Sequence, residues 1–135
     1  MPSGFLLDTN ALSDLISGQD EKLRRRFKTV PINEIRISAL TRGEIEYGIA
    51  KRPEAKRRAQ IAADLFDLID VLPWTSQTAL VYGRLRLEIQ RAGKALGPLD
   101  MLIAAQAMEV DAVLVTRDRA FRHVPGLQAE DWSQD

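Results

Sequence analysis

Four acidic residues lie where an apolar run of the sequence gives way to a segment with helical spacing. They are Asp8 in Leu-Leu-Asp-Thr-Asn, Glu44, Asp100 in Gly-Pro-Leu-Asp, and Asp118 in Val-Thr-Arg-Asp. Two unit charges about 4 Å apart repel by about 4 kcal/mol at an effective dielectric of about 20, so four carboxylates in one crevice need a counter-charge. Hard divalent cations supply it, and an oxygen-only ligand set favours Mg²⁺ or Mn²⁺ over zinc.

A carboxylate site of this kind indicates hydrolysis of a phosphodiester. Two bound ions activate water and stabilise charge on the phosphate, so no serine or histidine nucleophile is required. In this interpretation Asp8 and Asp100 bind the principal ion, while Glu44 and Asp118 complete a weaker second site or hold water. The single histidine, His123, is expected to cap a turn.

Each acid also has an ordinary structural explanation. Asp8 is suited to cap a helix, Asp100 to be a first-turn acid after Pro98, Glu44 to favour an early helical turn, and Asp118 to nucleate a turn. Catalysis is favoured only because all four are expected at the same edge of one sheet. Ligands of open α/β sheets bind there, outside the carboxyl ends of the strands.

The elements that must position these acids are short apolar runs alternating with helical segments. Strands are expected at residues 5–7, 35–38, 70–72, 112–116 and 127–129. Helices are expected at residues 11–17, 21–28, 40–51, 54–68, 78–92 and 99–109. Within the fourth helix Ile61, Leu65, Leu68 and Ile69 recur at spacings of three and four, which predicts one core-facing stripe. The alternation predicts an α/β three-layer sandwich with a mostly parallel, twisted sheet.

Composition predicts one domain over residues 1–135, because the length, the 45% apolar content and the 28% charged content are ordinary for a single domain. The absence of cysteine excludes disulfides, thiolate nucleophiles and cysteine zinc sites. No signal peptide and no apolar stretch of about 20 residues is present, so a cytoplasmic protein without a membrane segment is expected.

Charge balance by itself gives no nucleic-acid signal, because 19 basic and 19 acidic residues cancel. The distribution is more informative. Basic residues concentrate in two runs, 22–28 and 51–58, and each run is equally consistent with phosphate binding or with a solvated helix face. Trp74 and Trp132 are expected to be packing residues rather than stacking platforms for bases.

Four segments in fixed order carry a resemblance to a known family. They are Leu7-Asp8-Thr9-Asn10, Ile37 to Gly48, Asp100 to Ala105, and Leu114 to Asp118 with Phe121. Together they resemble the PIN-domain ribonucleases, and among these the VapC toxins of bacterial toxin–antitoxin pairs. The resemblance extends over nearly the whole chain.

The resemblance implies a set of site residues and partners. Its acidic centre and polar supports correspond to Asp8, Glu44, Asp100 and Asp118, with Asn10 and Thr116 in support. It further implies Mg²⁺ or Mn²⁺ as cofactor, endonucleolytic cleavage of RNA, a homodimer, and inhibition by a small cognate antitoxin. Because this branch often has Asn at the fourth position, Asp118 either binds metal directly or orients water or another ligand.

Three other functions also involve a fold or an acidic site of this kind. Phosphoryl transfer through an aspartyl phosphate is disfavoured, since Asp8 is followed by Thr9 and Asn10 rather than another acid and the last long strand ends in Thr116 and Arg117 rather than lysine. A non-catalytic nucleic-acid-binding or partner-binding module of the same fold remains open. So does a housekeeping RNA-processing nuclease.

Overall fold

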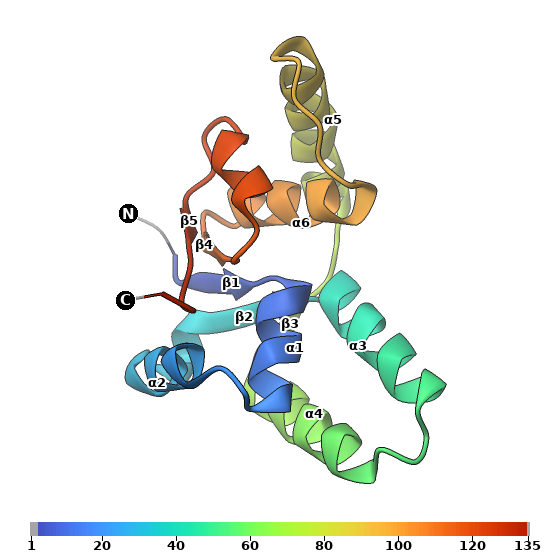
Figure 1. The fold of residues 1–135 in the computed structure, drawn as a ribbon. Coiled ribbons are helices and arrows are strands. Elements are labelled where there is room, and N and C mark those ends of the chain that lie inside the picture. Colours follow the sequence, from blue (N-terminus) through green and yellow to red (C-terminus); the bar gives the residue numbers. More distant parts are fainter. Residues whose placement is uncertain (1–2, 135) are drawn as a thin grey trace.

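A five-stranded sheet in the order β3-β2-β1-β4-β5 forms the centre of the computed structural model, which describes residues 3–134 (Figure 1). All four strand pairs are parallel. The strands are β1 Phe5–Leu7, β2 Ile35–Ser38, β3 Asp70–Leu72, β4 Val113–Val115 and β5 Ala129–Glu130. Gly4 opens β1 with φ 83°, and a Cβ at this position would lie 2.5 Å from the carbonyl oxygen of Glu34. Only glycine fits this backbone position.

Six α-helices connect and cover the strands, together with two short 3₁₀ turns. The helices are α1 Thr9–Ser17, α2 Glu21–Thr29, α3 Ala39–Lys51, α4 Lys56–Leu68, α5 Ser76–Arg91 and α6 Pro98–Glu109. The 3₁₀ turns are η1 Ile32–Glu34 and η2 Arg119–His123. Within the described residues no helix has the length and apolarity needed to cross a bilayer.

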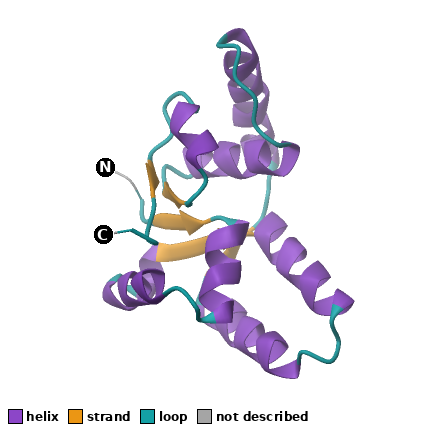
Figure 2. Cartoon of the chain, in the orientation of Figure 1, coloured by secondary structure: helices purple, strands orange, loops and turns teal. Residues whose placement is uncertain are grey.

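The sheet separates two hydrophobic cores, because neighbouring residues of a strand point to opposite faces. Leu6 and Leu114 pack with α5, α6 and η2 on one face, whereas Leu7 and Val115 pack with α1 to α4 on the other. Figure 2 shows helices on both sides of the strands. The predicted three-layer α/β sandwich with a parallel sheet is confirmed.

The strand order reverses beside β1. From β1 the chain builds outward through β2 and β3, and then returns to the other side of β1 to form β4 and β5. In the β1–β4 pair Leu7 lies opposite Val115, and the Asp8 N–H donates to the Val115 carbonyl at 3.0 Å. The carboxyl ends of β1 and β4 therefore meet at a topological switch point, where open α/β sheets bind their ligands.

The predicted strands and helices are all present, with boundaries that differ by one or two residues. The predicted stripe of α4 is wrong at Leu68, which is 56% exposed. The side that packs into the core with α1 and α3 runs through Ile61, Ala62, Leu65 and Phe66 to Ile69 at the end of the helix, so the prediction holds at Ile61, Leu65 and Ile69. Ala62 is completely buried, so the helix approaches its neighbours through a small side chain, and Leu68 is turned to solvent.

Candidate active site

Asp8 lies immediately after β1 and is the N-cap of α1. Its backbone is extended, with φ −77° and ψ 175°, and its carboxylate accepts a hydrogen bond from the Ala11 N–H at 2.8 Å. The side chain is only 4% exposed. The predicted cap is therefore real, and it holds the carboxylate at the carboxyl edge of the sheet, so the structural and catalytic interpretations of Asp8 are compatible.

Thr116 connects Asp8 to the segment that carries Asp118. Its hydroxyl hydrogen-bonds to the Asp8 carboxylate and accepts the Asp118 N–H at 3.0 Å. Asp118 in turn caps η2 by accepting the Ala120 N–H at 2.9 Å. Thr116 is buried, so this link between the ends of β1 and β4 is shielded from water.

Asp100 reaches the same edge from the opposite layer of helices. It lies in the first turn of α6, two residues after Pro98, and is half-buried. Proline at the first helical position and glycine at the N-cap define where α6 begins. The helix start thereby fixes the position from which Asp100 faces Asp8 and Asp118.

The three aspartates interact electrostatically. Burial raises the pKa of Asp8 above its ordinary value of 3.8, the hydrogen bonds from Thr116 and Ala11 oppose this rise, and the charges of Asp100 and Asp118 add to it. Burial likewise raises the pKa of Asp100, and the charge of Asp118 adds to the effect. Perturbed carboxylates that act on one another in this way are typical of functional sites.

The other residues predicted for the site are less closely associated with it. Glu44 is exposed on α3, and its side chain has no ion pair or hydrogen bond with any residue from 3 to 134. Asn10 is exposed in the first turn of α1, and its side chain likewise lacks a hydrogen-bond partner in the described chain. The structure thus brings Asp8, Asp100, Asp118 and Thr116 together, whereas Glu44 and Asn10 point to solvent.

The donor chemistry of the three aspartates fits Mg²⁺ or Mn²⁺, because it consists of oxygen ligands whose mutual repulsion a cation would relieve. In the part of the chain that is described, however, no three histidine or acidic side chains are gathered closely enough to hold a metal ion. The aspartates are neighbours rather than a closed coordination shell. Binding a cation would require their side chains to draw together.

Buried polar residues that sequence reasoning did not single out also lie at this edge. Ser38 ends β2 and caps α3 by accepting the Leu40 N–H at 3.0 Å. Thr41 in the first turn of α3 accepts a hydrogen bond from the Thr9 hydroxyl at 3.4 Å, which joins the starts of α3 and α1. A serine directly before a helical segment is a recognisable N-cap signal, whereas the Thr9–Thr41 contact has no signal in the sequence.

Arg117 fastens the segment between Thr116 and Asp118 to α1. Its guanidinium forms a 2.9 Å ion pair with Asp14, and the pair is partly exposed. Since Asp8 begins α1 and Asp118 follows Arg117, the pair is a second connection between the two segments that carry aspartates. In the sequence, Arg117 is notable only because it stands where a phosphoryl-transfer site would have a lysine.

Comparison with known proteins places this chain in a family. The model of the PIN domain matches residues 5–127. The chain is 33% identical over 129 residues to the tRNA(fMet)-specific endonuclease VapC of Salmonella typhimurium. The alignment covers 95% of this chain and 97% of that protein. It is 34% identical over 130 residues to the protein of the same name from Shigella flexneri, and this alignment covers 96% of this chain and 98% of that protein.

Solved structures show the same relationship. DNA-bound VapBC from Salmonella typhimurium superimposes with a TM-score of 0.88 at 33% identity and covers 96% of this chain and 98% of its own. VapBC2 from Rickettsia felis, bound to a DNA fragment from its promoter, superimposes with a TM-score of 0.87 at 25% identity and covers 95% and 98%. A family model spanning most of the chain, together with relatives above 30% identity over nearly its full length, shows that this protein belongs to the PIN-domain family, in its VapC branch.

Proposed function

We propose that this chain is a metal-dependent endoribonuclease that acts as the toxin of a toxin–antitoxin pair. The observation that carries the proposal is the convergence of Asp8, Asp100 and Asp118 at the switch point between β1 and β4. Relatives of this chain are named as VapC ribonucleases and tRNA-specific endonucleases. The three aspartates, with Glu44 as the fourth acid, are the groups proposed to act on the RNA phosphodiester.

The site residues have different roles in this proposal. Asp8 and Asp100 supply the principal negative charge, and Thr116 holds the Asp8 carboxylate in place while it positions the backbone of Asp118. Mg²⁺ or Mn²⁺, when bound, would acidify water and stabilise charge on the phosphate. Glu44 enters the site only if its exposed side chain turns toward the aspartates.

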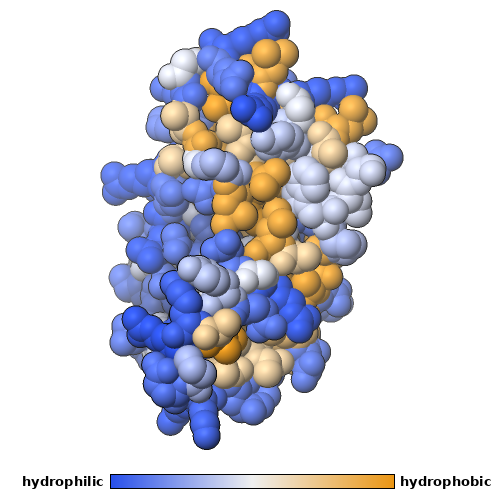
Figure 3. Space-filling view, turned by 90° about the vertical axis from the view of Figure 1, so that its right-hand side faces the viewer, coloured by the Kyte–Doolittle hydropathy of each residue, from blue (hydrophilic) through white to orange (hydrophobic). Residues whose placement is uncertain are grey.

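Two partners are included in the proposal. A small cognate antitoxin is supported by the solved relatives, several of which are VapBC complexes, two of them bound to DNA. A homodimer is supported by the exposed apolar side chains Tyr47 on α3 and Leu80 and Leu87 on α5. Figure 3 shows apolar surface gathered over the side of the molecule on which α3 and α5 lie, and such surface is typical of protein contacts. A cytoplasmic location is also part of the proposal, because RNA is the proposed substrate.

The test is RNA cleavage by the purified chain with Mn²⁺ or Mg²⁺, with and without EDTA, beside the variant Asp100→Asn. Metal-dependent cleavage that disappears in the variant supports the proposal. Absence of cleavage under every metal condition would instead favour a non-catalytic binding module of the same fold. Cleavage without growth inhibition on expression, and without an antitoxin that reverses such inhibition, would favour a housekeeping nuclease.

A further inference from the structure

The five basic side chains of helix α2 lie on two sides of the helix. Arg25 and Arg26 lie three and four residues after Lys22, and the three side chains line a cleft of about 570 Å³ between α2 and the C-terminal segment. Arg24 and Lys28 lie on another side of the helix and line a separate groove against α1 and α4. Residues three and four apart are neighbours on a helix, but Arg25 and Lys28 are also three apart, so the elements that pack against α2 decide which cleft each basic side chain lines.

We infer that the cleft bounded by Lys22, Arg25 and Arg26 binds the phosphate backbone of the RNA beside the position where it is cut. The inference rests on the proposed ribonuclease function and assigns a substrate surface to it. In the free protein the net charge of the whole chain is zero, whereas α2 carries five basic residues and one acidic residue. This concentration of positive charge on one helix is what a polyanion would recognise.

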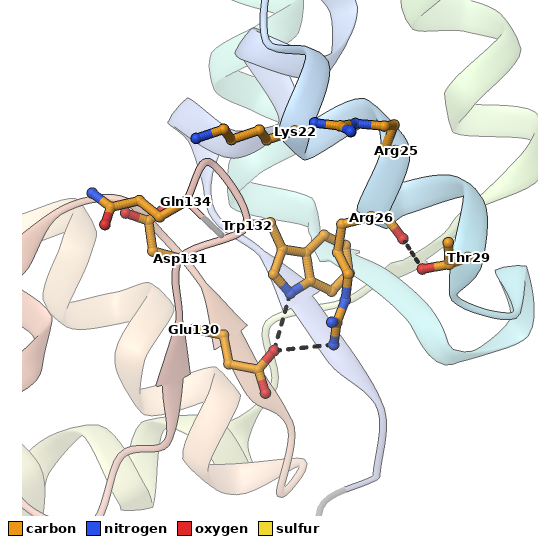
Figure 4. Close-up of a pocket in the computed structure, with 8 residues that line it drawn as sticks. All are labelled: Lys22, Arg25, Arg26, Thr29, Glu130, Asp131, Trp132 and Gln134. Atoms are coloured by element: carbon orange, nitrogen blue, oxygen red, sulfur yellow. Dashed lines mark hydrogen bonds and ion pairs between the residues drawn. The ribbon is translucent and has the colours of Figure 1, made fainter.

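The acidic side chains of the cleft are engaged with protein groups. Glu130 accepts the Trp132 indole N–H at 3.1 Å and pairs with Arg26 at 3.5 Å, as Figure 4 shows. Asp131 accepts the backbone N–H of Ser133 at 2.9 Å. Arg25, by contrast, makes no ion pair with the residues described, and a bound phosphate would supply one.

The ion pair between Arg26 and Glu130 is weak enough for another anion to replace Glu130. Both side chains are almost half exposed, and ion pairs of this kind contribute little net free energy. The Arg26 guanidinium also lies over the Trp132 ring, 5.4 Å from the ring centre. A phosphate can therefore replace Glu130 as its partner while the ring keeps the guanidinium in the cleft.

The cleft adjoins a small pocket that Asp118 lines. Glu130 and Asp131 line the cleft and also line a small pocket beside Thr116 and Asp118. The backbone explains this arrangement, because the Thr116 N–H donates to the Glu130 carbonyl at 2.9 Å and so joins the carboxyl ends of β4 and β5. A strand of RNA lying in the cleft would therefore pass close to Asp118.

The chemistry of the cleft indicates recognition of the backbone rather than of bases. Trp132 packs edge-on against Phe5 and is only 4% exposed, so it cannot serve as a stacking platform. Contacts from lysine and arginine to phosphates carry no direct sequence information. An acidic protein segment would suit the other groove better, since Phe27, Ile61 and Leu65 contribute apolar side chains to its lining.

The second basic run of the sequence, residues 51–58, occupies a different place. It spans the connection between α3 and α4, which Figure 1 shows at the ends of these helices remote from the sheet. Within this run Lys51 lies 4.5 Å from the centre of the Tyr47 ring, and Arg58 donates to the Ser13 hydroxyl at 2.9 Å. Of the two runs that sequence analysis left undecided, the structure favours 22–28.

The first experiment measures RNA binding without cleavage. In an Asp100→Asn background with EDTA, binding of a labelled single-stranded RNA is followed by fluorescence anisotropy at several salt concentrations. The pair Arg25→Ala/Arg26→Ala is expected to weaken binding about tenfold and to reduce the salt slope by about 1.4, since each phosphate contact to a single strand contributes about 0.7. The matched pair Arg24→Ala/Lys28→Ala removes the same charge from the other side of α2 and is expected to bind like the parent.

The second experiment uses the absence of cysteine from the sequence. A photo-crosslinker attached through Thr29→Cys, at the end of the cleft, is expected to capture RNA, whereas the same group attached through Ala50→Cys on α3 is not. Equal capture at both positions, or unchanged RNA affinity and salt slope in the Arg25/Arg26 pair, would overturn the inference. So would an Arg25/Arg26 pair that retains RNA affinity and loses only the binding of an acidic protein.

These outcomes separate the inference from the function on which it rests. If RNA binds through the cleft but is never cut, the ribonuclease proposal alone fails. If RNA is cut and the Arg25→Ala/Arg26→Ala variant leaves both KM and kcat unchanged, only the inference that RNA binds in the cleft fails. The supporting result in the active background is a raised KM with kcat retained, because the two arginines bind RNA away from the reacting phosphate.

Discussion

The Thr116 hydroxyl hydrogen-bonds to the Asp8 carboxylate while it accepts the backbone N–H of Asp118 at 3.0 Å. One buried side chain thereby joins the ends of β1 and β4 and serves two of the three clustered aspartates. The bond to the Asp118 N–H is local, two residues along the chain, whereas the bond to Asp8 exists only because β1 and β4 pair.

Removing the Thr116 hydroxyl is expected to affect both stability and cleavage. Thr116→Val keeps the shape and loses both hydrogen bonds, which leaves buried groups unsatisfied at a cost of about 1–3 kcal/mol in the free energy of unfolding. Thr116→Ser retains the hydroxyl and is expected to keep most of the activity. Urea denaturation and RNA cleavage of the two variants check this, and equal behaviour of Val and Ser would show that the hydroxyl has no such role.

Asp8 is expected to be needed for cleavage but not for folding. Asp8→Asn retains a good N-cap and removes a buried charge, so the variant should fold at least as stably as the parent while cleavage falls about a hundredfold or more, equivalent to about 3 kcal/mol of transition-state stabilisation. Asp8→Ala loses the cap to Ala11 and should cost about 1 kcal/mol in stability. Full cleavage by Asp8→Asn would remove Asp8 from the proposed mechanism.

The raised pKa values of Asp8 and Asp100 predict how stability depends on pH. In the folded protein these groups hold their protons above the ordinary pKa of 3.8, so the folded state binds more protons than the unfolded chain in that window. Their contribution to stability is therefore greatest below 3.8 and is lost as pH rises through the folded pKa values. Asp100→Asn should abolish the contribution of Asp100 to this pH dependence. The stability of the variant relative to the parent should therefore rise between about pH 4 and about pH 7. Denaturation at a series of pH values measures this difference, and a constant difference would contradict the assignment.

A divalent cation is expected to stabilise the folded chain. If Mg²⁺ or Mn²⁺ binds only the folded state, a concentration about 100 times Kd adds about 2.7 kcal/mol and raises the Tm. EDTA should reverse the shift, and Asp100→Asn should reduce it. The matched control is Asp111→Asn, because Asp111 is an exposed acid with φ 55° and asparagine tolerates this conformation. A Tm shift of the same size in both variants would place the cation elsewhere.

Glu44→Gln tests the fourth acid separately. Because Glu44 is exposed and makes no described contacts, the substitution should change stability by less than about 0.5 kcal/mol. Cleavage should still fall clearly if the side chain turns toward the aspartates during catalysis. The matched control is Glu46→Gln, an exposed acid two residues along α3. Equal activity of the two variants would reduce the site to three aspartates.

Local features of the sequence were sufficient for most of the secondary structure. Apolar runs such as Phe5–Leu7, and cap and turn residues such as Asp8 and Pro98, depend on neighbours within a few residues, and their effects can be read from the chain. The same holds for the spacing of Lys22, Arg25 and Arg26 along one side of α2. These features also placed three acids at the ends of strands or the starts of helices.

The tertiary structure decided which of those residues meet. Strand order depends on pairing between segments about a hundred residues apart, and no local pattern specifies that β4 returns to lie beside β1. This pairing brings Asp118 and Thr116 to Asp8, while the position of α3 leaves Glu44 in solvent. Packing likewise selected Ala62 over Leu68 as the contact of α4, because close approach of helices depends on the volume of both partners. The chemical groups could be named from the order of amino acids, but their meeting place depends on long-range pairing and packing.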